Sequence, residues 1–200
     1  EEMTLAAGEV AFGVDASPSR RTQLYERDVE VNQLERTIRK QVVAHLSIPG
    51  SRVDVPHCLL LMSLAKDVER VGDYAKNMAK RTGVLAQSPA VADSAAALRR
   101  MAREVELMLK DALDAFVSGN TVLARGVIPR DKRVDEMNKT YQDNLTELME
   151  ASSENIRRCR HLTVICKCLE RIADHAKNIA EDAVLLHEAK DIRHAGAANG

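Results

Sequence analysis

Two pairs of carboxylates, each spaced by four residues, are the side chains in this sequence best suited to chemistry. Glu69 and Asp73 form one pair, and Glu170 and Asp174 form the other. In a helix, residues four apart stack on one face with about 5–6 Å between their Cβ atoms. Like charges at that distance repel slightly, whereas a cation held between the oxygens reverses the sign of the interaction. The spacing therefore indicates cation binding.

Both pairs belong to a segment that the chain carries twice. Residues 66–80 (KDVERVGDYAKNMAK) match residues 167–181 (KCLERIADHAKNIAE) without a gap and at a constant offset (170 − 69 = 101, 178 − 77 = 101). Positions that are apolar in one copy stay apolar in the other, as with Val71 and Ile172. A match of this density within one chain indicates an internal repeat.

The repeat extends to an earlier segment, which adds further oxygen ligands. Asp28 with Asn32 aligns with Asp131 and Asp135, again four residues apart (131 − 28 = 103). If these helices lie side by side with the motif helices, each repeat gathers four oxygen-bearing side chains. The predicted metal-ligating residues are Asp28, Asn32, Glu69, Asp73, Asp131, Asp135, Glu170 and Asp174. Such a set suits a hard cation such as Mg²⁺, Mn²⁺, Ca²⁺ or ferric iron rather than structural zinc.

Helical periodicity predicts the elements that position these residues. Leu, Val, Ala, Met, Glu, Lys and Arg dominate and aromatic residues make up 2% of the chain, a composition typical of long helices. A fifth helix is expected to bend near 126–129, because Pro129 removes a hydrogen-bond donor and clashes with the turn before it. The six predicted helices span residues 1–14, 18–46, 55–85, 89–117, 121–151 and 153–187.

The short links between these helices make neighbours antiparallel. The sequence therefore predicts an all-α fold of two tandem antiparallel three-helix bundles related by the internal repeat. A single domain, 1–200, would hold repeat one at 1–86, repeat two at 88–188 and a disordered tail at 189–200. The counterpart of the fourth helix would begin about 15 residues before Glu1, so we expect the chain to be part of a longer product.

The carboxylate pairs are expected to point away from the core. At 100° per residue, Glu170 and Asp174 lie on the opposite side from the apolar stripe of the last helix. That stripe consists of Ile165, Leu169, Ile172, Ala176, Ile179 and Ala183. In a chain that is 30% charged, however, outward acids beside Arg and Lys are usually a solvated face with weak ion pairs. A metal-free helical adaptor is therefore an alternative.

Composition and missing motifs exclude other classes of function. A net charge of −1 and the scarcity of aromatic residues give no case for a nucleic-acid partner. No catalytic residue is predicted and an enzyme is not expected, because the acidic pairs lack the Glu-x-x-His motif of four-helix di-iron proteins. His175, next to Asp174, is interpreted as a surface histidine. The four cysteines, predicted to be buried free thiols, fit a reducing cytosol.

The sequence resembles the PhoU family at Glu69–Asp73 (ERVGD) and Glu170–Asp174 (ERIAD), each followed by Ala-Lys-Asn. That family has two tandem three-helix repeats with an E(D)xxxD motif in each, and the resemblance covers nearly the whole chain. The family's earlier acidic motif is matched at 28–32 and 131–135. Its Asp-Leu-Arg segment before each motif helix is altered here, to Asp54-Val-Pro and Asn155-Ile-Arg.

The resemblance implies a cytoplasmic regulator of phosphate uptake, acting peripherally at the inner face of the membrane. The implied partners are a phosphate ABC transporter, its sensor histidine kinase and a second copy of the chain in a homo-oligomer such as a dimer. The implied cofactors are metal ions, either iron in multinuclear form or zinc, manganese or magnesium, held at the acidic motifs. A PhoU-like domain also follows the membrane part of some sodium/phosphate cotransporters, which is a second alternative.

Overall fold

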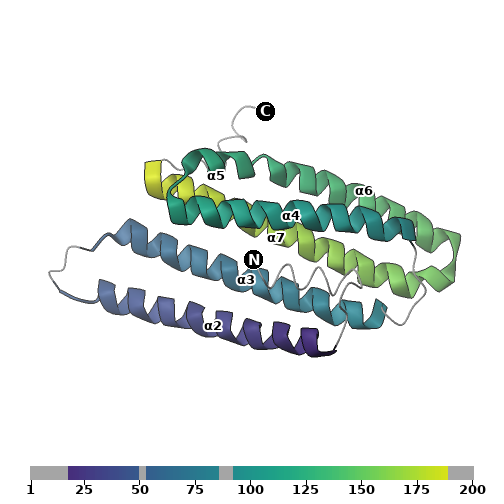
Figure 1. Ribbon diagram of the computed structural model, residues 1–200, viewed down its shortest axis with the longest axis horizontal. Coiled ribbons are helices and arrows are strands. Elements are labelled where there is room, and N and C mark those ends of the chain that lie inside the picture. The colour runs from purple at the N-terminus through teal and green to yellow at the C-terminus, as the bar shows by residue number, and fades with distance from the viewer. Residues whose placement is uncertain (1–17, 50–52, 86–91, 189–200) are drawn as a thin grey trace.

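Long helices running side by side build this protein (Figure 1). The computed structural model describes residues 18–49, 53–85 and 92–188. Within those ranges every regular element is helical, which confirms the all-α prediction. The elements are α2 (Pro18–Leu46), α3 (Val55–Leu85), α4 (Ala92–Ser118), α5 (Thr121–Val127), α6 (Arg130–Ala151), the short 3₁₀ helix η1 (Ser153–Asn155) and α7 (Ile156–Glu188). The helix predicted at 1–14 and the tail at 189–200 lie outside the described residues.

The helix ends follow local capping chemistry. The Asp54 carboxylate accepts a hydrogen bond from the backbone N–H of His57 at 3.0 Å, and Asn120 accepts one from Leu123 at 3.0 Å. Gly119, between α4 and α5, has φ +69°, a left-handed conformation that favours a residue without Cβ. The predicted bend is a break between α5 and α6 at residues 128–129, where proline interrupts the hydrogen-bond ladder.

The two repeats meet where α3 lies against α7. Helix α2 packs on α3, while α4, α5 and α6 pack on α7. Helices α3 and α7 run antiparallel to each other, and α2 lies on the far side of α3 from the second repeat (Figure 1). We call the contact between α3 and α7 the seam. None of the described helices is both long and apolar enough to cross a bilayer.

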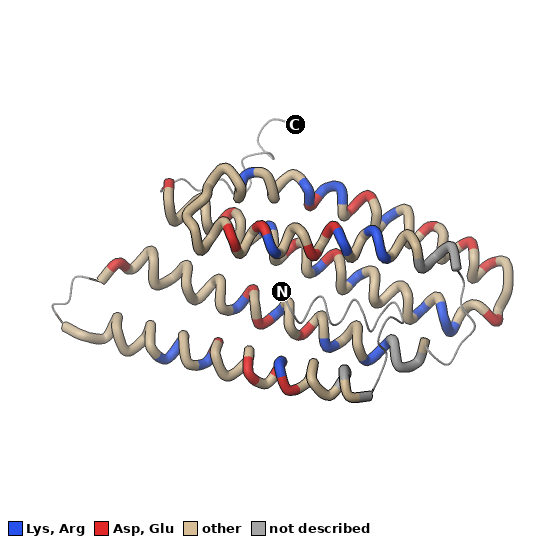
Figure 2. Tube along the Cα trace, viewed as in Figure 1, with Lys and Arg blue, Asp and Glu red and all other residues tan. Residues whose placement is uncertain are grey.

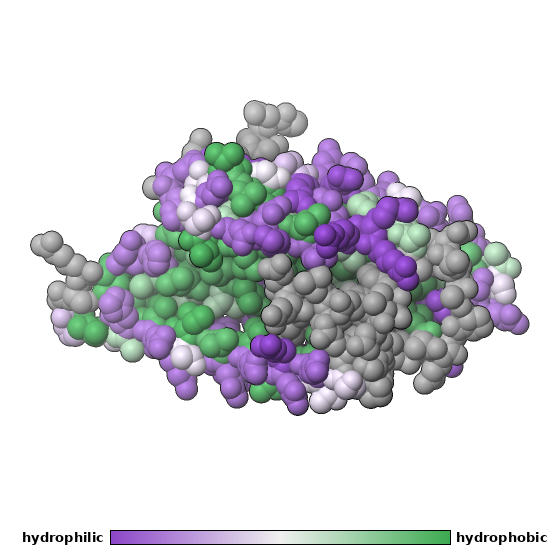
Figure 3. Space-filling view, in the orientation of Figure 1, coloured by the Kyte–Doolittle hydropathy of each residue, from purple (hydrophilic) through white to green (hydrophobic). Residues whose placement is uncertain are grey.

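Helix α7 carries the centre of the core. Each of the six residues of its predicted apolar stripe, from Ile165 to Ala183, is at most 1% exposed, which confirms the stripe. Two of the equivalent positions of α3, Leu64 and Val68, are only partly buried, whereas Val71, Ala75 and Met78 are buried. In the left part of the band between α3 and α4, Figure 3 shows apolar residues, and hydrophilic residues gather along the outer edges.

The four cysteines are buried free thiols, as predicted. Burial raises the pKa of Cys166 to about 12 and that of Cys168 to about 11. Both thiols are therefore protonated at neutral pH, and the thiolate that would be needed for nucleophilic or metal-binding chemistry is not formed. These residues fill the core between the helices.

Candidate functional site

The second repeat brings its four predicted acidic residues together where α6 lies beside α7. Asp131 and Asp135 come from the start of α6, and Glu170 and Asp174 from the middle of α7. Burial raises the pKa of Asp174, and the charges of Glu170, Asp131 and Asp135 raise it further. Burial, Asp131 and Glu170 likewise raise the pKa of Asp135. These four residues, which we call the second carboxylate cluster, concentrate negative charge on one face.

A lysine from α7 partly neutralises this cluster. The Nζ atom of Lys177 donates to Oδ2 of Asp131 at 2.8 Å, and the Asp131 residue is only 7% exposed. The hydrogen bond to Asp131 raises the pKa of Lys177, so the ammonium is charged at neutral pH. The protein thus places its own cation against the most buried carboxylate of the cluster.

Glu170 retains a buried oxygen that accepts no hydrogen bond. Its Oε1 atom accepts a hydrogen bond from Lys167 at 2.5 Å, while its buried Oε2 atom accepts no hydrogen bond and has the Arg171 guanidinium at 3.8 Å. A buried carboxylate oxygen without a donor is costly, and a bound cation would remove that cost. The donor set of the cluster therefore fits a hard cation in its chemistry.

The acidic side chains are not arranged as a complete metal site. Over the described ranges, no group of three His, Cys, Asp or Glu side chains is arranged to hold a metal ion. In the second cluster the Lys177 ammonium already binds Asp131. A metal ion bound by Asp131, Asp135, Glu170 and Asp174 would therefore meet the Lys177 ammonium at Oδ2 of Asp131.

The first repeat uses an equivalent lysine in a tighter arrangement. Lys76, which aligns with Lys177 (76 + 101 = 177), donates to Asp28 at 2.6 Å and to Asp73 at 3.0 Å. Burial alone would lower the pKa of Lys76, but these two carboxylates raise it overall. Acidic and basic residues are interleaved along the middle of α3 (Figure 2). In this repeat, then, the lysine bridges the two helices that carry the predicted ligands.

The other two predicted ligands of the first repeat bond within their own helices. The Asn32 amide donates to the backbone carbonyl of Asp28 at 2.9 Å. Glu69 accepts from Lys66 at 2.7 Å. The structure thus joins Asp28 and Asp73 through Lys76, whereas Asn32 and Glu69 have local partners. We call Asp28, Asn32, Glu69 and Asp73 the first carboxylate cluster.

The sequence predicts that both carboxylate pairs point away from the core, but the glutamates are only slightly exposed. The Glu69 and Glu170 side chains are 15% and 14% exposed, whereas Asp73 and Asp174 are each 36% exposed. The physical reason is lateral packing: α2 lies beside α3 and α6 lies beside α7, so these neighbours cover part of each glutamate. The pairs line the edges of helix–helix contacts instead of a free surface.

His175, interpreted from the sequence as a surface residue, lies at the seam. Its side chain is 18% exposed, and its Nδ1 atom is 2.6 Å from Oδ1 of the buried Asp67 on α3. Its ring also contacts Tyr74, with 5.8 Å between the ring centroids. Sequence reasoning missed Asp67 and this role for His175. The available signal was that Tyr74 and His175 are equivalent in the repeat and both carry a polar ring.

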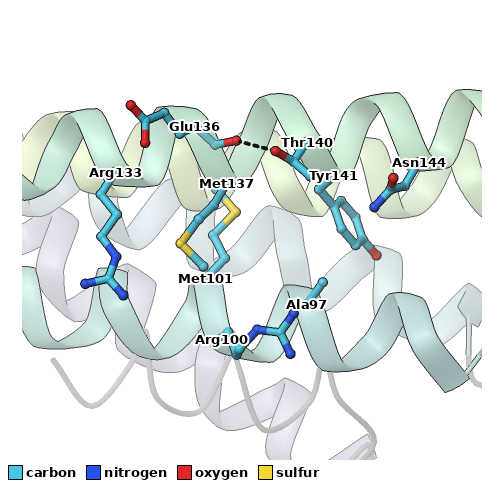
Figure 4. Close-up of a pocket in the computed structure, with 9 residues that line it drawn as sticks. All are labelled: Ala97, Arg100, Met101, Arg133, Glu136, Met137, Thr140, Tyr141 and Asn144. Atoms are coloured by element: carbon cyan, nitrogen blue, oxygen red, sulfur yellow. Dashed lines mark hydrogen bonds between the residues drawn. The ribbon is translucent and has the colours of Figure 1, made fainter.

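A separate pocket between α4 and α6 involves none of the predicted ligands. It has a volume of about 320 Å³. Met101, Met137 and Tyr141 lie between the two helices, with Arg100 and Arg133 beside them (Figure 4). The pocket is therefore not part of the carboxylate clusters.

Fold and site together define a class of all-helical protein in which a carboxylate-bearing helical unit occurs twice. The model of the family described as "PhoU domain" matches residues 10–82 and 98–183. The chain belongs to the PhoU family, which confirms the resemblance of its repeated motifs.

Individual relatives agree with this assignment. The chain is 33% identical over 186 residues to the phosphate-specific transport system accessory protein PhoU homolog of Pseudomonas aeruginosa, a match that covers 92% of this chain and 76% of the relative. It is 38% identical over 130 residues to the protein of the same description from Caulobacter vibrioides, covering 64% of this chain. The match spans little more than half of that Caulobacter protein, 56% of its length.

Solved structures share the fold. The crystal structure of PhoU from Pseudomonas aeruginosa superimposes with a TM-score of 0.89 at 29% identity, covering 94% of this chain and 90% of that one. The phosphate transport system regulatory protein PhoU from Streptococcus pneumoniae superimposes with a TM-score of 0.78, covering 96% and 94%. At 22% identity, the second likeness shows the fold alone.

Proposed function

We propose that this chain is a PhoU-type regulator of phosphate uptake, which works by binding and not by catalysis. The observation that carries the proposal is the match, over 92% of the chain, to a relative described as a phosphate-specific transport system accessory protein. Its proposed partners are a phosphate transporter and the associated sensor histidine kinase, at the cytoplasmic face of the membrane. A homo-oligomer such as a dimer is part of the same proposal.

Metal binding at the carboxylate clusters is the proposed chemistry of this regulator. Three features of the second cluster support it: the mutual repulsion of four carboxylates, the unsatisfied Oε2 atom of Glu170 and an all-oxygen donor set. Bound iron, manganese, magnesium or zinc would supply positive charge that holds α6 to α7. Lys177 and Lys76 would compete with that ion for Asp131 and Asp28.

Elemental analysis of protein purified without chelator tests the metal proposal. We expect bound metal in the unaltered protein and a clear loss in the Glu170→Gln/Asp174→Asn variant, which keeps the side-chain shapes. The matched control is Glu106→Gln/Asp114→Asn, because these α4 acids also have ion-paired partners but belong to neither cluster. Absence of metal from the unaltered protein would favour the metal-free adaptor instead.

Co-purification tests the regulatory proposal. Tagged full-length protein would be isolated from cells grown in high and in low phosphate, and its partners identified by mass spectrometry. Enrichment of a phosphate transporter subunit or a sensor kinase is the expected result. Recovery of neither under both conditions would contradict the proposal. Membrane-spanning segments in the same polypeptide would identify a sodium/phosphate cotransporter domain.

A further inference from the structure

An open pocket of about 410 Å³ lies at the seam between the two repeats. Its lining includes Arg70 and Tyr74 from α3, and Arg171, Asp174 and His175 from α7. Asp174 of the second carboxylate cluster and Lys177, which pairs with that cluster, also line the pocket, but guanidinium groups from both repeats give it a different character. Such groups recognise oxyanions, not metal ions.

The internal repeat places these two guanidinium groups around one centre. Tyr74 and His175 are equivalent positions (175 − 74 = 101), yet their rings contact each other with 5.8 Å between centroids. Residues related by a two-fold axis meet only where the axis passes between them. This contact and the antiparallel course of α3 and α7 (Figure 1) together indicate a pseudo-two-fold axis close to the two rings. Arg70 and Arg171 are also equivalent and lie one turn earlier on each helix, so they approach the pocket from its two sides.

Both guanidinium groups keep donors available for a ligand. Arg70 is 3.7 Å from the nearest oxygens of Glu69 and Asp73, which is too far for a hydrogen bond. Arg171 donates through Nη1 to Asp174 at 3.2 Å. Each side chain is about half exposed, and a guanidinium has five N–H donors in a planar fork. Two such forks match the oxygens of a tetrahedral anion.

The remaining polar groups select among tetrahedral anions. Because the carboxylate of Asp67 accepts the hydrogen bond from Nδ1 of His175, the other ring nitrogen is left for the pocket. Asp174 brings a carboxylate, which repels an anion that carries no proton but accepts a hydrogen bond from one that does. Inorganic phosphate retains a proton near neutral pH, whereas sulfate does not.

We propose that the seam pocket binds inorganic phosphate, with Arg70 and Arg171 holding its oxygens and Asp174 accepting a hydrogen bond from its remaining proton. A phosphate group on an ester shares this chemistry but has lost its last proton at slightly alkaline pH, since its second pKa is about 6. Free phosphate is therefore the favoured ligand. The residues that line the pocket support phosphate binding. The use of bound phosphate as a regulatory signal rests on the proposed function.

Isothermal titration of the chelator-treated full chain at pH 8 tests this proposal. Inorganic phosphate is expected to bind more tightly than sulfate or O-phosphoserine. Arg70→Gln and Arg171→Gln should each weaken phosphate binding by about tenfold or more, because each removes a charge-assisted pair of hydrogen bonds. Arg103→Gln is the matched control, since Arg103 pairs with Glu106 on α4 away from the seam.

Asp174→Asn provides a second variant with a different readout. It should reduce the preference for phosphate over sulfate, because an amide does not repel the unprotonated anion as a carboxylate does. No phosphate binding up to roughly 10 mM, equal binding of sulfate, or unchanged affinity in both arginine variants with native helicity would overturn the proposal. The titration needs no metal and no partner protein, so failure to bind phosphate would leave the regulatory proposal standing. Failure to recover a transporter or kinase partner would likewise leave the phosphate proposal standing.

Discussion

Lys177 of α7 donates a hydrogen bond to Asp131 of α6 across the helix contact, with 2.8 Å between the nitrogen and the oxygen. Lys76 makes the same contact with Asp28 in the first repeat, at 2.6 Å. Each carboxylate cluster thus contains a lysine that occupies part of the space and charge a metal ion would need. A metal ion bound there would therefore compete with the lysine for the same carboxylate oxygens.

Replacing the lysine should strengthen metal binding and weaken the metal-free protein. Lys177→Met leaves the buried Asp131 carboxylate without its partner, which should cost about 1–3 kcal/mol of unfolding free energy. Added Mn²⁺ or Mg²⁺ should restore that stability, and metal affinity should rise about tenfold because the competing charge is gone. Thermal unfolding with and without metal measures both effects. Lys110→Met, in an exposed pair with Asp114, is the control. A variant that binds metal more weakly would contradict the competition.

Metal binding should weaken as pH falls. Burial, and to a lesser extent neighbouring carboxylates, raise the pKa values of Asp135 and Asp174. Protons therefore compete with a metal ion at pH values above the ordinary pKa of aspartate. Because these protons must leave before the oxygens bind, affinity should increase as pH rises through the raised values. Titrations with Mg²⁺ at several pH values measure this. An affinity that does not change over about pH 5 to 8 would count against these ligands.

The same raised pKa values affect the stability of the metal-free protein. Between the ordinary and the raised pKa, the folded state binds more protons than the unfolded state, so this contribution to unfolding free energy falls as pH rises. Asp135→Asn and Asp174→Asn remove it. Each variant should therefore gain stability relative to the unaltered protein as pH rises from about 4 to 7, measured by urea unfolding. If the variants instead lose stability relative to the unaltered protein over that interval, folding lowers the pKa values of these carboxylates and does not raise them.

Equivalent core positions should respond unequally to truncation. Leu169 is 1% exposed, whereas its counterpart Val68 is only partly buried. Leu169→Ala should cost about 2–5 kcal/mol, because a cavity remains in a closely packed site. Val68→Ala should cost about 1 kcal/mol, in proportion to the smaller area it buries. Chemical denaturation of both variants makes the comparison, and equal losses would mean that the repeats are packed equally.

Two glycines close together in the chain should differ in the sign of their alanine effect. Gly119 has φ +69°, and a Cβ there would lie 3.0 Å from Cε1 of His187. Gly119→Ala should therefore cost about 1–2 kcal/mol. Gly126 lies in α5, and a Cβ there would meet nothing within 4 Å, so Gly126→Ala should add about 0.5–1 kcal/mol. Melting temperatures test the pair, and a stabilising Gly119→Ala would refute the argument.

The helices were predictable from the sequence because their signals are local. Asp54 as a cap, Pro129 as a break and the 3.6-residue period of the α7 stripe all act within one or two turns. The repeat offset then implied that α3 and α7 are equivalent. The aligned acidic positions also predicted that the carboxylates of α6 and α7 would gather, and Glu170, Asp131 and Asp135 lie close enough to Asp174 to raise its pKa.

The lateral environment of the site was not predictable in the same way. A helical wheel shows the direction of Glu170 relative to its own helix, but not that α6 covers that direction. Whether Lys76 reaches Asp28 depends on the longitudinal register of α2 against α3, which no short-range pattern determines. The contact of His175 with Asp67 depends in turn on how the two repeats pack. These features arise from tertiary packing alone.

The contact between Tyr74 and His175 has an implication for how the molecule arose. In a homodimer of identical three-helix units, a side chain on the symmetry axis can only face a copy of itself. Fusion of two units into one polypeptide lifts that restriction, and each copy becomes free to change alone. Here a phenol faces an imidazole, and Asp67, which binds the imidazole, has Cys168 as its counterpart (168 − 67 = 101). A duplicated chain can therefore place unlike rings, here a phenol and an imidazole, where a symmetric homodimer would place two identical ones.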